Sequence, residues 1–181
     1  KRQGFSPYRR DDLKRAVDTL SPVGDRSTGP PLSIGKWNVS RVINMRNMFS
    51  DAKSFNKDLS KWNVGKVTRM QGMFFQASAF NGDLSQWDVS QVVDMHAMFG
   101  LATSFNQNLS KWDVSRVTDM SYMFSVASSF KSDIYKWDVS SVISMNGMFL
   151  CATVFNSDLS KWDVSSVTDM NHMFAYVRSF D

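Results

Sequence analysis

Tryptophan recurs every 25 residues along the chain, and this period constrains the fold more than any other feature of the sequence. Methionine and phenylalanine keep the same period without a single insertion. A unit of this length cannot bury its apolar side chains alone, so successive copies must stack and share one continuous core. The sequence therefore predicts six stacked coils, whose tryptophans are Trp37, Trp62, Trp87, Trp112, Trp137 and Trp162.

Each 25-residue unit carries two apolar patterns in succession. Trp62 and Val64 alternate with polar residues, which is typical of a short strand. Met70, Met73 and Phe74 follow at spacings of three and four residues, which is typical of one face of a short helix. In most units a residue that can cap a helix stands just before this second pattern. We therefore predict a short parallel strand and a short helix in every coil.

The spacing L-x-x-L-x-L in a repeat of this length is the signature of leucine-rich repeats, with Trp and Val here in place of two leucines. The unit D-L-S-K-W-D-V-S-S-V-T-D-M-N-H-M-F, from Asp158 to Phe174, also resembles the repeats of the BspA-like leucine-rich-repeat surface-protein family. The resemblance covers Leu32 to Phe180. It implies a right-handed solenoid with a binding or surface role, and it transfers no catalytic residue. The predicted fold class is an α/β repeat, a leucine-rich-repeat-like right-handed solenoid of six coils with an N-terminal helical cap.

Residues 1–31 lie outside the repeat, which occupies residues 32–181. The apolar residues between Leu13 and Leu20 fit one face of a helix, and a loop rich in Gly, Ser and Pro follows from Val23 to Pro31. We expect a cap over the first coil, because an uncovered edge invites pairing; the alternative is a mobile basic arm that reaches a partner. The chain stops at Asp181 without a polar capping unit, so we expect that it continues or that a partner covers this end.

The overall charge of +4 hides an asymmetry along the chain. Residues 1–80 hold 15 Lys or Arg against 6 Asp, a net charge of +9, whereas residues 81–181 hold 6 against 11, a net charge of −5. Such a split favours end-to-end or two-partner recognition, because complementary potentials set encounter and orientation. The other explanation is drift among solvated surface positions.

Two rows of polar side chains are expected on the outer surface of the predicted strands. One row is mainly Lys and the other, two residues later, is Asn or Asp, so both rows point to the same side. Neighbouring carboxylates about 5 Å apart could hold calcium or resemble the carboxylate pair of a retaining glycosidase. The adjacent lysines instead favour a network of surface ion pairs. The candidate protein-binding face consists of Lys61, Asn63, Asp88, Lys111, Asp113, Lys136, Asp138, Lys161 and Asp163.

Two further polar rows are expected to shape the corners of the coils. Asp or Asn precedes the inward Leu or Ile of most units, as Asp58 does, and is expected to hydrogen-bond the local backbone. A row of asparagines that includes Asn56, Asn81 and Asn106 is expected to stack its side-chain amides within the turn. Both rows are therefore predicted to be structural.

The sequence offers no constellation for catalysis. Cys151 is the single cysteine, and His96 and His172 lie three repeats apart and out of register. Neither a Gly-rich phosphate loop nor a G-x-S-x-G elbow occurs. We therefore predict no catalytic, cofactor-binding or metal-binding residues, and a protein that is not an enzyme. Burial of the aromatic rows argues against a nucleic-acid partner, and no apolar stretch is long enough for a membrane-spanning helix.

Together these features predict a non-catalytic protein–protein interaction or structural scaffold subunit of a larger assembly. The alternative is a cell-surface adhesin module that binds host or matrix ligands through the polar face. An organelle-targeting extension in the precursor would favour the first function, and a secretory signal or lipid anchor would favour the second. The compartment therefore stays open between an organellar assembly and the cell surface.

Overall fold

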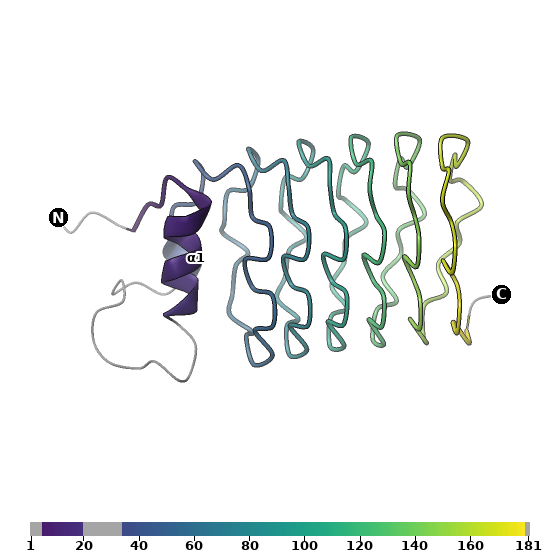
Figure 1. Cartoon of the computed structure of the whole chain (residues 1–181), viewed down its shortest axis with the longest axis horizontal. Coiled ribbons are helices and arrows are strands. Elements are labelled where there is room, and N and C mark those ends of the chain that lie inside the picture. The colour runs from purple at the N-terminus through teal and green to yellow at the C-terminus, as the bar shows by residue number, and fades with distance from the viewer. Residues whose placement is uncertain (1–4, 20–33, 180–181) are drawn as a thin grey trace.

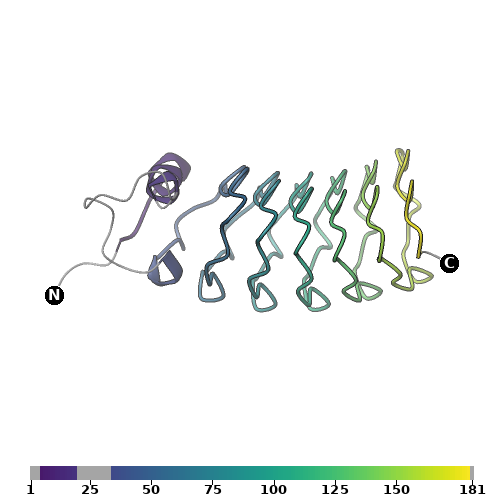
Figure 2. The same ribbon diagram turned by 90° about the horizontal axis from the view of Figure 1, so that it is seen from below.

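The computed structural model describes residues 5–19 and 34–179. Its described N-terminal part contains α1, Arg10–Asp18, and the 3-10 helix η1, Ile34–Lys36. Six coils lie side by side along the long axis of the molecule, with α1 at one end of the row (Figure 1). A view from below shows the same row (Figure 2). We number the coils 1–6 by their residues: 34–58, 59–83, 84–108, 109–133, 134–158 and 159–179.

The predicted strand and helix in every coil are wrong. Within the described residues, α1 is the one α-helix, and the coils are joined by isolated parallel bridges rather than by strands of a sheet. The α/β, leucine-rich-repeat-like right-handed solenoid is therefore replaced by a stack of turn-rich coils. The bridges join Asn44 to Arg69, Arg69 to Asp94, Asp94 to Asp119, Asp119 to Ser144 and Ser144 to Asp169.

Consecutive turns, not a helix, produce the spacing of the methionines and phenylalanines. In coil 2, Gly72 and Gln76 have φ angles of 57° and 59°, a left-handed conformation that interrupts a right-handed helix. The N–H of Gly72 donates to His96 O of coil 3 at 2.8 Å, and those of Met70 and Phe74 also donate to coil 3. These donors are therefore used between coils and cannot form the bonds of a helix. Helices and serial turns place apolar side chains at similar spacings, which explains the wrong prediction.

Turns lie on both sides of the segment that was predicted to be a strand. Leu59 O accepts the N–H of Trp62 at 2.9 Å, and Val64 O accepts the N–H of Val67 at 2.8 Å. The side chains between these turns still alternate, because Trp62 and Val64 are buried while Asn63 is exposed. The predicted inward and outward positions are thus correct although no strand forms.

Rows of identical side chains run through the interior of the stack, as the sequence predicts. The ring of Phe124 stacks on Phe99 of the preceding coil, with 5.6 Å between centroids, and on Phe130 of its own coil at 3.8 Å. The indole Nε1 of Trp112 donates to Leu84 O of the preceding coil at 2.9 Å. The core therefore combines apolar contacts with a hydrogen bond that each coil makes to its neighbour. The same indole bond is made by Trp62, Trp87, Trp137 and Trp162.

Helix α1 packs on coil 1. Leu13, Ala16 and Val17 are buried in the same apolar cluster as the coils. The guanidinium of Arg10 donates to Arg46 O from Nε at 3.1 Å and from Nη2 at 2.9 Å. An outward carbonyl of coil 1 therefore receives donors from α1 where an interior coil would receive them from another coil.

The helix predicted from the apolar residues between Leu13 and Leu20 is confirmed, and it ends at Asp18. Leu20, the expected loop from Val23 to Pro31 and the chain end at Asp181 lie outside the described residues. The packing of α1 favours the cap over the mobile arm for the described part of this segment. The division into residues 1–31 and 32–181 stays a prediction.

Candidate functional site

The two predicted polar rows lie on the surface and form what we call the polar face. Every residue of the candidate protein-binding set, from Lys61 to Asp163, is exposed. The residues between the two rows are buried tryptophans, so each coil presents one Lys-row and one Asp-row side chain around an inward indole. The lysine row is Lys36, Lys61, Gln86, Lys111, Lys136 and Lys161, and the aspartate row is Asn38, Asn63, Asp88, Asp113, Asp138 and Asp163.

The carboxylates of the aspartate row are held by their own coil. Asp113 Oδ1 accepts the backbone N–H of Ser115 at 3.1 Å and the Ser115 hydroxyl at 2.6 Å. Asp88 and Asp138 accept the same pair of bonds from the serine two residues later. Each carboxylate is therefore fixed in an Asx turn, which orients it without a contact to the next coil.

These bonds also keep the aspartates ionised. The Ser140 hydroxyl, followed by its backbone N–H, lowers the pKa of Asp138, against smaller opposing effects of desolvation and of the Asp163 charge. The hydroxyl and N–H of Ser165 lower the pKa of Asp163 in the same way. A bond to the charged form stabilises that form, so the serine bonds favour the charged carboxylates of Asp138 and Asp163.

The lysine row makes no ion pair with the aspartate row. In the described ranges, the ion pairs within 4 Å join Arg10 to Asp11 and Lys14 to Asp18, both in α1. The predicted network of surface ion pairs is therefore wrong. The ammonium groups of the lysine row remain available to carboxylates from outside the chain, although Lys136 also lies 5.5 Å from the centroid of the Tyr135 ring.

The two corner rows have the structural role that the sequence predicts. Asp58 Oδ1 accepts the N–H of Ser60 at 2.9 Å, which is the expected local bond. The asparagines act between coils: Asn56 Oδ1 accepts the N–H of Asn81 at 3.0 Å, and Asn81 Oδ1 accepts that of Asn106 at 2.9 Å. Their side chains therefore hold successive corners together.

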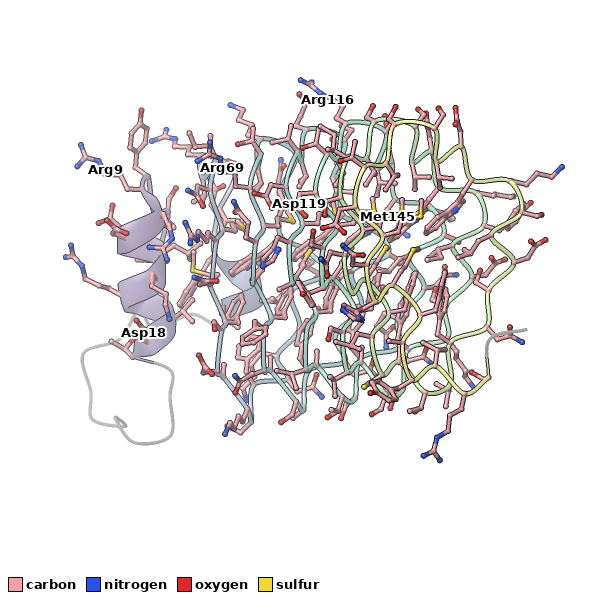
Figure 3. The ribbon with its side chains drawn as sticks, turned by 45° about the vertical axis from the view of Figure 1, so that its right-hand side comes forward. Arg9, Asp18, Arg69, Arg116, Asp119 and Met145 are labelled. Carbon is pink, nitrogen blue, oxygen red and sulfur yellow. The ribbon has the colours of Figure 1, made fainter. Side chains whose placement is uncertain are left out.

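A row of β-branched residues on the surface was missed by the sequence reasoning. Its members Ile43 and Ile143 are 61% and 51% exposed, which is unusual for isoleucine. The signal was present in the V-T, V-V and V-I pairs of the repeat, where the buried valine fixes the next side chain as outward. Figure 3 shows Arg116 at the outer edge of the stack and Met145 within it. The row is Ile43, Thr68, Val93, Thr118, Ile143 and Thr168.

Neither a metal-binding cluster nor a membrane-spanning helix is found among the described residues. Across residues 5–19 and 34–179, no group of three His, Cys, Asp or Glu side chains is placed to hold a metal ion. Among the carboxylates considered for calcium, Asp88 and Asp113 each accept a hydrogen bond from a serine hydroxyl of their own turn. No helix in this part of the chain has the length and apolar character needed to cross a membrane.

Comparison with known proteins yields a family match that extends over all six tryptophan units. The match covers residues 23–131 and 107–181, and the family is described as "Mycoplasma protein of unknown function, DUF285". Neither a curated protein nor a solved structure matches the chain. The match supports a repeat family, which is a coarser assignment than the resemblance to BspA-like proteins.

Proposed function

The chain belongs to the family described as Mycoplasma protein of unknown function, DUF285, and from its geometry we propose a non-catalytic scaffold that binds other proteins through the polar face. The observation that carries this proposal is the unpaired lysine row beside a row of fixed, ionised carboxylates. Both charges occur together in coils 4, 5 and 6, so a partner with a regular surface can contact several coils at once. Several weak contacts made together give a much tighter complex than one alone.

The chemistry of the polar face supports binding rather than catalysis. A carboxylate that acts as a general acid needs a pKa raised toward its working pH, whereas serine bonds lower the pKa values of Asp138 and Asp163. Exposed charges such as those of Lys111 and Lys161 act mainly on encounter and orientation with a charged partner. The proposal therefore includes the absence of enzymatic activity.

Neutralising the lysine row tests the proposal. The triple variant Lys61→Gln, Lys111→Gln and Lys136→Gln introduces the residue that Gln86 already supplies in this row, so the fold should be unaffected. The wild-type chain is incubated with an extract of the cells that make it, cross-linked and analysed by quantitative mass spectrometry. We expect stoichiometric partners that the triple variant loses.

Lys131→Asn is the matched control. Lys131 is an exposed lysine in the asparagine corner row, away from the polar face, and the substitution restores the residue of the other coils. This variant should retain every partner. An unchanged set of cross-links in the triple variant would reject the polar face, and recovery of the chain alone would reject the scaffold.

The alternative function is a cell-surface adhesin module, and the resemblance to BspA-like surface proteins supports it. In that case the polar face would bind host or matrix ligands instead of subunits of an assembly. Brief protease treatment of intact cells separates the two functions, because a surface-exposed chain is cleaved while an internal one is protected. Protection in intact cells with cleavage after lysis would reject the adhesin.

A further inference from the structure

A cavity of about 890 Å³ lies between α1 and coil 1, and the proposed function does not use it. Part of its wall is an apolar corner formed by Ala52 and Phe55. The equivalent Ala77 and Phe80 of coil 2 are fully buried, whereas Ala52 and Phe55 are only partly buried. The cavity therefore occupies part of the space that a preceding coil would fill, at a place where α1 does not cover the corner.

The sequence departs from its repeat where coil 1 borders this cavity. Lys53 and Lys57 both line it. Coils 2–5 have no lysine at either position. The pair of lysines is therefore absent from coils 2–5, although coil 6 carries Arg178 at the position of Lys53. The equivalents of Lys53 are Ser78, Thr103, Ser128 and Thr153, and those of Lys57 are Gly82, Gln107, Ser132 and Ser157.

Positive charge exceeds negative charge around the cavity. Five lysines and three aspartates line it, and Lys14 is paired with Asp18. Four lysines then face two aspartates, and none of the four makes an ion pair within the described residues. An anionic group is therefore the complementary ligand, and the apolar corner calls for a hydrophobic side chain beside it.

Backbone carbonyl groups at the cavity indicate which class of ligand would fit it. In coil 2, Met73 O and Phe75 O accept N–H groups of coil 1, each at 2.8 Å. The corresponding acceptors of coil 1 are Met48 O and Ser50 O, which receive no donor from the described residues, and both residues line the cavity. Carbonyl groups in a row need N–H donors, which a peptide backbone supplies and a fatty acid does not.

We propose that this cavity binds an acidic peptide segment with an apolar side chain. The peptide donates backbone N–H groups to Met48 O and Ser50 O, as a preceding coil would. Its apolar side chain packs on Ala52 and Phe55, and its carboxylates lie beside Lys53 and Lys57. The site adjoins the polar face and shares Lys36 and Lys61 with it, whereas Lys53 and Lys57 belong to the cavity alone.

Fluorescence anisotropy with a fluorescein-labelled peptide of alternating aspartate and phenylalanine tests the proposal. Lys53→Ser with Lys57→Gln restores residues found in other coils and leaves the polar face intact. We expect the wild-type chain to bind, and the double variant to bind roughly fivefold more weakly, since each exposed charge pair contributes modestly. Added salt should weaken wild-type binding more than binding by the variant.

Three matched probes examine the other contacts. A peptide with serine in place of phenylalanine lacks the apolar contact, one with lysine in place of aspartate lacks the negative charge, and one with N-methylated amides lacks the backbone donors. All three should bind more weakly than the first peptide. Retained binding by the N-methylated peptide would overturn the backbone docking.

Lys136→Gln is the control variant, because Lys136 lies on the polar face and not at the cavity. Its affinity for the peptide should equal that of the wild-type chain. An equal loss in this variant would place the peptide on the polar face and overturn the cavity site while leaving the scaffold function intact. Binding of oleate without binding of any peptide would overturn the peptide in favour of a lipid, and no binding at all would also overturn the proposal.

Discussion

Coils 5 and 6 follow the same sequence pattern but differ in burial. Met145 of coil 5 is fully buried, whereas Met170, at the same position in coil 6, is 40% exposed. Val139 and Val164 differ in the same way, at 1% and 39%. The difference teaches that the following coil completes the burial of these two inward side chains, which their own and the preceding coil leave about 40% exposed. The unit of stability in this molecule is therefore the interface between coils.

The largest effect is expected from Trp112→Ala, which weakens the interface between coils 3 and 4. The substitution leaves a cavity and removes the indole donor from Leu84 O. The free energy of unfolding should fall by about 3–5 kcal/mol, measured by urea denaturation. Trp112→Phe keeps most of the volume but lacks the donor, so it should cost less than the alanine variant. Equal losses in both variants would show that the hydrogen bond, and not the volume, determines stability.

The matched pair Met145→Ala and Met170→Ala tests the comparison directly. Met145→Ala should lower the free energy of unfolding by about 2–5 kcal/mol, because removal of the buried side chain leaves a cavity between two coils. Met170→Ala should lower the free energy of unfolding by about 1 kcal/mol, since the partly exposed side chain withdraws less apolar surface from water. Both values come from chemical denaturation under one set of conditions. Equal costs would mean that each coil buries its own methionine.

The inward positions could be predicted from the sequence because they depend only on the length of the repeat and on which residues in it are apolar. Trp112 and Phe124 recur in fixed register with other apolar residues, and any stack with this repeat places them inside. The exposure of Lys111 and Asp113 follows from the same register. The inward and outward positions were therefore predicted correctly even though the local backbone was not.

The backbone conformation could not be predicted because a short helix and a series of turns place apolar side chains at similar spacings. The left-handed φ angles at positions such as Gln76 and Tyr122 carry no consistent residue signature, since most of these positions are not glycine. They are maintained by hydrogen bonds to the next coil, which is a property of the stack. The cavity beside α1 was also missed, because Lys53 and Lys57 stand out only once coil 1 is known to border it.

Gly147→Ala tests the packing of one coil against the next at a buried position beside the Tyr122 ring. Gly147 has a φ of 56°, and a Cβ there would lie 2.5 Å from the ring of Tyr122 in coil 4. The left-handed conformation alone costs alanine about 1–2 kcal/mol, and the contact adds to this. Tyr122→Ser in the same chain should recover the contact part, measured as a double-mutant cycle. Strict additivity of the two substitutions would show that the ring does not lie over the glycine.

Unfolding at acid pH tests the serine bonds of the aspartate row. The effect on stability should be similar for Asp138 in coil 5 and Asp163 in coil 6. The folded-state pKa values of Asp138 and Asp163 are lowered from 3.8, so their contribution to stability is complete above that value. It is lost as the pH falls through the lower folded-state values, because only then are the folded carboxylates protonated. Urea midpoints should therefore fall in strongly acidic solution. Ser140→Ala with Ser165→Ala should flatten this dependence, and an unchanged slope would reject the serine bonds as its cause.

The smallest effect is expected from Asp113→Ala and Asp163→Ala, and here coils 4 and 6 should agree. Each carboxylate accepts its hydrogen bond from the serine two residues later within its own coil, so this bond does not require a following coil. Each alanine variant should leave the free energy of unfolding nearly unchanged, and Asp113→Asn should recover most of any loss, as Asn63 occupies this row. Equal losses here, beside unequal losses for the methionine pair, would separate bonds made within a coil from contacts made between coils. A larger loss at Asp113 than at Asp163 would mean that the outward row also depends on stacking.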